Sequence, residues 1–80
     1  MRTIDRINRA LRGTGYRLHR NVRGGSYYYL SSDGAKVPVE CSIYCYSLGP
    51  TDSDFNLAAY EINDAFRREL LPPPIAYINK

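Results

Sequence analysis

Residues 37–46 carry the sequence feature that most restricts the fold, a strict alternation of two kinds of side chain. One set is apolar and consists of Val37, Val39, Cys41, Ile43 and Cys45. The other set is mostly polar or aromatic and consists of Pro38, Glu40, Ser42, Tyr44 and Tyr46. Because successive side chains of a β-strand point to opposite faces, this period of two predicts a strand with one face in the core and one outside it. The chain is therefore expected to build a sheet that is covered on one side.

Two further strands are predicted before this one, which we place at residues 36–47. Residues 15–22 and 26–31 are rich in aromatic and aliphatic side chains, and a glycine-containing loop at residues 23–25 separates them. The Asp33-Gly34 dipeptide then favours a two-residue hairpin turn into the third strand. This order predicts an antiparallel meander of three strands.

The predicted faces also determine the expected register. A two-residue turn at Asp33-Gly34 places Leu30 opposite Val37 and Tyr28 opposite Val39. A loop of three or five residues before the second strand sets Leu18 opposite Leu30. Tyr28 and Leu30 are thus expected to face the core.

Two helices are predicted, one before and one after the strands. Residues 3–12 place apolar side chains on one stripe, with Thr3 as the N-cap and Gly13 at the end. The second helix is expected to begin among the possible capping residues 51–53 and to reach about Leu71, before three consecutive prolines. Its expected core stripe is Phe55, Ala58, Ala59, Ile62, Phe66 and Leu70.

These elements predict an α+β fold of the order αβββα, with both helices on one face of the sheet. An 80-residue chain has room for a single compact domain, which we place at residues 1–80. The tail at residues 72–80 is apolar enough that we expect it to pack on the domain or to pair with a sheet edge as a fourth strand.

Candidate binding residues come from the exposed sheet face and from the first helix. The predicted parity turns one group of aromatic and basic side chains outward, namely Arg17, His19, Tyr27, Tyr29, Tyr44 and Tyr46. A helical wheel places a second group opposite the core stripe of the first helix, namely Arg2, Arg6 and Arg9. Tyrosine and arginine are enriched in protein interfaces, and aromatic rings on an open sheet can also stack on unpaired bases. Two plainer interpretations stay open: the tyrosines pair across strands beneath the tail, and the arginines form a solvated helix face.

Charge is unevenly distributed along the chain. Residues 1–36 hold eight Lys or Arg against two Asp, and residues 37–80 hold three Lys or Arg against six acidic residues. The first half therefore has a net charge of +6 and the second half of −3, which favours an anion-facing surface in the first half.

The sequence does not favour an enzyme, a metalloprotein or a membrane protein. There is one histidine, His19, and no acidic cluster beside it, so a catalytic site is not expected. Cys41 and Cys45 are interpreted as reduced, buried thiols, because two cysteines four apart on a strand are too distant for a disulfide. No cofactor and no metal are expected. The sequence contains no apolar run of membrane-spanning length and no recognisable signal peptide, so a cytoplasmic protein is expected.

The order of elements resembles that of a double-stranded RNA-binding domain, which also runs helix, three strands, helix. That family places a lysine cluster at the start of its second helix. This chain has Thr51, Asp52, Ser53 and Asp54 at the corresponding place. Because those acidic residues would repel phosphate, the resemblance implies the topology and not the RNA contact.

The chain also resembles small phage and prophage proteins of similar length, through residues 15–18, 27–29 and 42–46. Those proteins often carry an aromatic residue, usually Trp, near the start of the last helix, where this chain has Phe55. The resemblance implies an accessory protein of a mobile element, a class that includes inhibitors of host defence such as anti-CRISPR proteins.

Together these observations predict a non-catalytic binding protein that docks on a protein or nucleoprotein through its Tyr- and Arg-rich surface. The alternative is a regulatory module that binds DNA or RNA directly. A homodimer formed through the edge of the third strand or through the tyrosine face is a further possibility.

Overall fold

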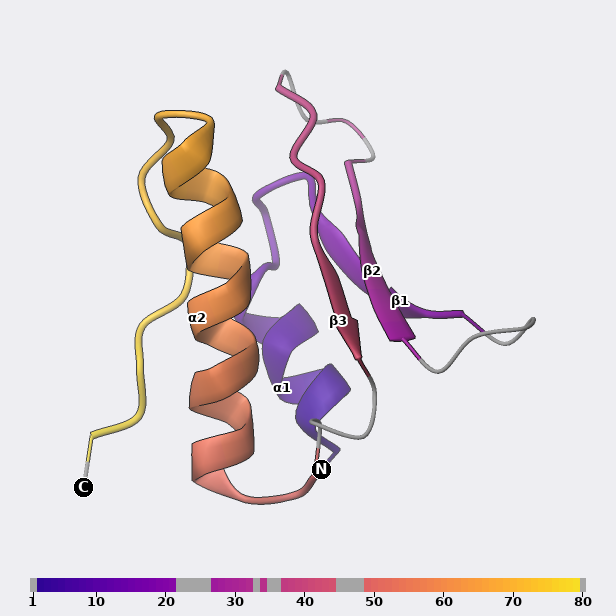
Figure 1. The fold of residues 1–80 in the computed structure, drawn as a ribbon, viewed down its shortest axis with the longest axis vertical. Helices are drawn as coiled ribbons and strands as arrows, with labels where there is room; N and C mark the ends of the chain where they lie inside the picture. Colours follow the sequence, from indigo (N-terminus) through magenta and orange to yellow (C-terminus); the bar gives the residue numbers. More distant parts are fainter. Residues whose placement is uncertain (1, 22–26, 33, 35–36, 45–48, 80) are drawn as a thin grey trace.

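The computed structural model describes residues 2–21, 27–32, 34, 37–44 and 49–79, with Tyr44 described by its backbone alone. The elements run in the order α1 (Thr3–Ala10), β1 (Arg17–Arg20), β2 (Tyr27–Ser31), β3 (Ser42–Tyr44) and α2 (Asp52–Arg68). The three strands form one antiparallel sheet in the order β1-β2-β3. Both helices lie on the same side of the sheet (Figure 1). The predicted αβββα fold is confirmed.

The register between β1 and β2 agrees with the prediction, whereas that between β2 and β3 does not. Leu18 lies opposite Leu30, as expected. Tyr28 lies opposite Ile43 instead of Val39, so the partner has shifted by four residues along the chain. Because an even shift leaves every side chain on its original face, the predicted inward direction of Tyr28 and Leu30 is still correct.

The shift arises because residues 37–40 do not form the beginning of the third strand, and pairing with β2 resumes only at Cys41, whose carbonyl accepts from the Leu30 N–H at 3.1 Å. The Tyr16 hydroxyl donates to the Val37 carbonyl, and the Val39 N–H donates to the Ser32 hydroxyl at 3.3 Å. Pro38 has no N–H to offer to a ladder. The Val39 side chain is nevertheless buried in the core, so this segment packs against the sheet end without extending the pairing. The predicted strand 36–47 is therefore too long at its beginning.

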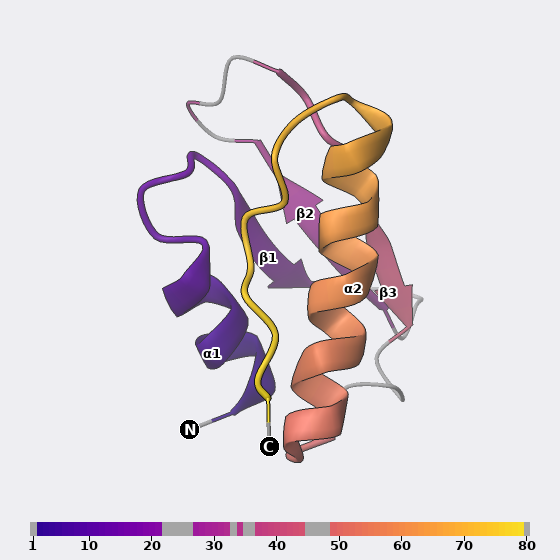
Figure 2. The same ribbon diagram turned by 90° about the vertical axis from the view of Figure 1, so that its left-hand side faces the viewer.

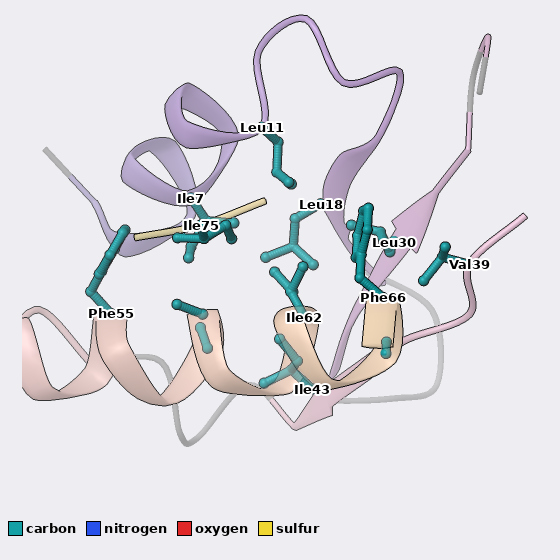
Figure 3. Packing of buried hydrophobic residues seen from close by; sticks show 13 residues of the cluster. Ile7, Leu11, Leu18, Leu30, Val39, Ile43, Phe55, Ile62, Phe66 and Ile75 are labelled. Carbon is teal, nitrogen blue, oxygen red and sulfur yellow. The ribbon is translucent and has the colours of Figure 1, made fainter. Parts of the chain in front are cut away.

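A single apolar core lies between the sheet and the helices (Figure 3). Each element contributes buried side chains to it, including Ile7 from α1, Leu18 from β1 and Ile62 from α2. The full set is Ile7, Leu11, Leu18, Leu30, Val39, Ile43, Phe55, Ala58, Ala59, Ile62, Ala65, Phe66 and Ile75. Leu70, which was expected in the core stripe, is 94% exposed because α2 ends before it.

The C-terminal tail runs back between α1 and α2, on the side of the helices away from the sheet (Figure 2). Two asparagines of α2 hold it by pairing with its backbone as a neighbouring strand would. The Asn63 amide donates to the Ile75 carbonyl at 2.8 Å and accepts from the Ile75 N–H at 3.1 Å. Asn56 makes the same pair of bonds with Ile78, at 2.9 and 2.8 Å. Within residues 72–79 the tail forms no strand.

A third asparagine covers the free edge of β1. The Asn8 amide donates to the Leu18 carbonyl at 3.0 Å and accepts from the Leu18 N–H at 2.7 Å. These two backbone groups point away from β2, because Leu18 and Leu30 form a pair without ladder hydrogen bonds. Asn8 therefore joins α1 to the sheet and protects an edge that would otherwise be open to pairing.

The helix ends agree only in part with those predicted from the sequence. Thr51 and Asp54 form the reciprocal capping box that begins α2. The N-cap of α1 is Arg2 instead of the expected Thr3, whose hydroxyl donates to the Gly49 carbonyl at 2.5 Å. Thr3 thus joins the two helix beginnings and does not cap its own helix.

The end of α2 is a Schellman turn with an unusual residue. The Leu71 N–H donates to the Phe66 carbonyl and the Leu70 N–H to the Arg67 carbonyl, at 3.0 and 2.9 Å. Leu70 has a φ of +59°, in the left-handed region that glycine normally occupies at this position. This turn reverses the chain, so that the tail can return along the helices.

Candidate binding surface

The face of the sheet away from the helices carries aromatic and polar side chains, and we call it the outer face. It is formed by Arg17, His19, Tyr27, Tyr29, Ser31 and Ser42, on alternate positions to the buried Leu18, Leu30 and Ile43. No helix and no part of the tail covers it within the portion of the chain that the structure describes (Figure 1). The interpretation in which the tail hides the tyrosines is therefore wrong, because the tail lies on the opposite side.

Three aromatic rings form a cluster at the centre of this face. The His19 and Tyr29 rings lie across from each other on β1 and β2 and stack, with centroids 5.4 Å apart and planes 22° apart. The Tyr27 ring is 6.4 Å from that of Tyr29 at a tilt of 59°. Tyr29 is 41% exposed. His19 and Tyr29 each cover one ring face of the other and leave the rest of the cluster open to a partner.

The His19 ring is also held by a serine. His19 Nε2 lies 2.8 Å from Ser31 Oγ, and the Ser31 hydroxyl in turn donates to the Arg17 carbonyl at 3.3 Å. Which of the two atoms donates depends on the tautomer of the His19 ring. In either tautomer the contact ties the imidazole on β1 to Ser31 on β2 and so orients the ring.

The arginines predicted on the first helix do not act as one surface. Arg6 makes an ion pair with Asp52 at 3.0 Å, and its guanidinium lies 4.8 Å from the centre of the Phe55 ring. Arg2 pairs with Asp5 at 3.1 Å, and this hydrogen bond lowers the pKa of the Asp5 carboxyl. Arg6 therefore joins α1 to α2, and Arg2 neutralises a neighbour on its own helix.

Arg9 and Arg17 come together in space, and a residue that sequence reasoning missed joins them. Both line a hollow between α1 and the beginning of β1, together with Arg12 from the turn after α1. The spacing of Arg9 and Arg12, three residues apart near a helix end, is a signal that could have identified the third member. Three arginines thus line one hollow beside β1.

Two predicted tyrosines cannot be placed as side chains. Tyr44 lies opposite Tyr27 in the sheet, which assigns its backbone position to β3. Tyr46 lies outside the described residues. Four tyrosines were predicted to gather on the outer face. Side-chain contacts there are described for two of them, Tyr27 and Tyr29.

Cys41 directly precedes β3, faces α2 and is half-buried instead of buried as predicted. Its thiol lies 3.7 Å from the Glu61 carbonyl, and burial raises the pKa of the Cys41 thiol to about 11. The thiolate, which is the reactive and metal-binding form, is therefore disfavoured at neutral pH. Cys45 lies outside the described residues. Among the residues that are described, no three His, Cys, Asp or Glu side chains gather in a way that could hold a metal ion.

Comparison with known proteins gives no relative from which to transfer a function. No family model matches the chain, and no curated protein or solved structure matches it either. Within the described ranges, neither helix is long and apolar enough to cross a membrane. The functional argument therefore depends on the outer face and on the arginines beside it.

Proposed function

We propose that this protein is a non-catalytic binding domain that docks on a protein or nucleoprotein target through its outer face. The observation that carries the proposal is the stacked His19–Tyr29 pair, with Tyr27 beside it, on a sheet face that no described element covers. Large aromatic side chains that are already held in place lose little freedom on binding, which is what an interface anchor requires.

The charge beside the cluster supports a target with acidic groups. Arg17 extends from the same face and is exposed. Its planar guanidinium suits carboxylates and phosphates, and such charges at an interface border direct encounter and orientation. An acidic protein surface, or a protein surface next to bound nucleic acid, fits this combination of aromatic centre and basic border.

The resemblance to small phage proteins makes host-defence complexes the first targets to test. In this proposal the protein acts in the cytoplasm as an accessory or inhibitor of the anti-CRISPR type. The purified protein should co-elute with a nucleoprotein defence complex and reduce its target cleavage. If a panel of such complexes shows neither co-elution nor loss of cleavage, the anti-defence form of the proposal is refuted.

A matched pair of tyrosine variants tests the surface itself. Tyr29→Ser removes the central ring of the outer face, whereas Tyr60→Ser removes a tyrosine of similar exposure, 52%, from α2 in the opposite layer. We expect Tyr29→Ser to weaken target binding about tenfold or more and Tyr60→Ser to leave it unchanged. Equal effects of the two substitutions would remove the outer face from the proposal.

Direct nucleic-acid binding is the second candidate, and the basic residues favour it. Arg9, Arg12, Arg17 and Arg20 are exposed, and none is ion-paired with an acidic residue of the described chain. Binding through them should weaken steeply with salt, because each neutralised phosphate releases counterions. A gel-shift series with single- and double-stranded DNA and RNA tests this. Absence of salt-dependent binding at micromolar protein would exclude it.

Homodimerisation competes for the same surfaces. The outer face and the free edge of β3 could each pair with a second copy of the chain. Light scattering over a concentration series distinguishes monomer from dimer. If the wild type is a dimer and Tyr29→Ser is a monomer, the outer face is a self-interface and the docking proposal is replaced.

A further inference from the structure

A hollow of about 500 Å³ lies between the second half of α1 and the beginning of β1. Its lining includes Arg9, Arg12 and Arg17, which come from the helix, the following turn and the strand. All three are exposed, and none is ion-paired with an acidic side chain in the described part of the chain. The described arginines that do form ion pairs are Arg2, Arg6 and Arg68, and these lie outside the lining.

The charge of the lining is positive. Asp5 also borders the hollow, but its carboxylate is bound by Arg2 at 3.1 Å, which lowers the pKa of Asp5. Three arginines and one aspartate among the lining residues give them a formal charge of +2. Like charges around one hollow repel each other, and a bound anion of two charges would remove that repulsion.

The walls of the hollow are held in place without a ligand. The two hydrogen bonds between Asn8 and Leu18 tie α1 to β1. In the turn between them, the Thr14 hydroxyl donates to the Leu11 carbonyl at 2.6 Å and accepts from the Tyr16 N–H at 3.2 Å. A site whose frame is already rigid loses little freedom when it binds a ligand.

The helix dipole gives an ordinary explanation for part of this cluster. Basic residues near a helix C-terminus are favourable, which accounts for Arg9 and Arg12. It does not account for Arg17, which lies on a strand. The terminal carbonyls are also already in use, because Arg9 O accepts from the Arg12 N–H and Leu11 O from the Thr14 N–H. The arginines are thus free of these carbonyls and available to an anion.

We propose that this hollow binds the dianionic phosphate group of a phosphomonoester, with Arg9, Arg12 and Arg17 donating to its oxygens. A phosphomonoester carries close to two negative charges and three terminal oxygens, which match the +2 lining and the forked guanidinium donors. A carboxylate or a backbone phosphodiester offers a single charge. The group can belong to a small molecule or to the 5′ end of a nucleic-acid strand. The inference does not require docking through the outer face, with which the hollow shares only Arg17.

Titration with ribose 5-phosphate, followed by NMR at constant ionic strength, tests the site, with ribose as the control. The amide signals of Gly13 and Gly15, which border the hollow, should shift in a saturable way with ribose 5-phosphate alone. Affinity should fall severalfold between pH 7.5 and pH 5, because the ester takes up a proton near pH 6. Sulfate stays dianionic in that range, so its affinity should not change. Equal shifts with ribose, or no saturation, would overturn the proposal.

Two arginine variants separate the site from general charge. Arg12→Gln removes one donor from the hollow, and Arg20→Gln makes the same charge change on β1 outside it. We expect about tenfold weaker ribose 5-phosphate binding for Arg12→Gln and less than about a twofold change for Arg20→Gln. Both side chains are exposed, so both variants should fold, which circular dichroism verifies. Equal weakening by the two substitutions would reduce the site to a diffuse basic surface.

An oligonucleotide with and without a 5′-phosphate distinguishes the two sources of the group. Stronger binding of the phosphorylated strand than of ribose 5-phosphate would assign the site to a nucleic-acid end. Equal binding of these two would assign it to small phosphomonoesters. If the strand without the terminal phosphate binds as well as the phosphorylated one, the site binds the phosphodiester groups of the backbone and the proposal is wrong. Because none of these readouts involves a protein target, a failure of outer-face docking does not affect them.

Discussion

The two faces of the sheet differ in whether other parts of the described chain cover them. The inner face is covered by two helices, on whose far side the tail returns, and within the described chain no buried side-chain nitrogen or oxygen lacks a hydrogen-bond partner. The outer face is covered by none of these, and its rings contact one another. Stability therefore depends on the inner face, while residues of the outer face can serve recognition at little cost to folding.

The asparagines make this difference concrete. Asn8, Asn56 and Asn63 each use one amide to pair with both backbone groups of an apolar residue, in the manner of a strand. Asn8 thereby satisfies backbone groups at the edge of the sheet, and Asn56 and Asn63 satisfy backbone groups of the tail, which forms no strand within residues 72–79. Substitutions on the inner side should consequently be more damaging than comparable substitutions on the outer side.

The largest effect is expected from Asn63→Ala. Asn63 is 1% exposed, and its removal leaves the N–H and carbonyl of Ile75 without partners near the core. We expect the free energy of unfolding to fall by about 2–5 kcal/mol. Urea unfolding followed by circular dichroism measures it. A loss below about 1 kcal/mol would mean that the tail contributes little to closing the inner face.

Asn8→Ala should have a smaller effect of the same kind. Asn8 is only half-buried, so in its absence water can partly replace the two hydrogen bonds that its amide makes with the Leu18 backbone. A loss of about 1–3 kcal/mol is expected in the same urea experiment. The variant also opens the edge of β1, so light scattering should reveal new association. If Asn8→Ala changes neither the free energy of unfolding nor the association state, the edge of β1 does not need to be covered.

Leu70→Gly should stabilise the protein by about 0.5–1 kcal/mol. Leu70 holds a left-handed conformation that costs a side-chain residue more than glycine, and it is 94% exposed, so no packing is lost. The midpoint of thermal unfolding should rise. A decrease would indicate that the Leu70 side chain has a contact of its own, and Glu69→Gly, in the preceding residue with ordinary dihedral angles, is the destabilising control.

Tyr29→Ser tests whether the outer face contributes little to stability. The loss should be no more than about 1 kcal/mol, the range of a cross-strand side-chain pair. Binding and stability are thereby separated, because the same substitution is expected to weaken docking strongly. A loss comparable to that of Asn63→Ala would contradict the distinction between the two faces.

The last effect concerns Cys41 and is absent at neutral pH, because it appears only under alkaline conditions. Its pKa is raised by burial to about 11 from the ordinary 9.0, so the folded state keeps the thiol proton where the unfolded chain releases it. Stability should therefore be complete below pH 9 and decline between about pH 9 and pH 11. Cys41→Ala should reduce that decline. Parallel pH profiles for the two proteins would show that Cys41 is not buried when the chain is folded.

Part of the candidate surface could be predicted from the sequence, and the rest depended on contacts between distant residues. The direction of Tyr29 and His19 followed from the alternation on the strands, because the pleat of a strand leaves only two directions. The separation of Arg6 from Arg9 could not be predicted, because it depends on Asp52, 46 residues away, reaching one of them. The spacing of Arg9 and Arg12 connects these two in the sequence, but the turn that follows them has no periodic pattern, so it could not be predicted that both line one hollow with Arg17.

The sequence by itself determined the order of the elements, the core and outer faces of the strands and the beginning of α2, because each depends on neighbours within a few residues. Only the tertiary structure decided the register of β3, the path of the tail and the pairing of each arginine. Those features depend on which of several compatible partners lies within reach once the core has closed. A four-residue shift that keeps Val39 and Ile43 on the core side cannot be detected from a pattern of period two.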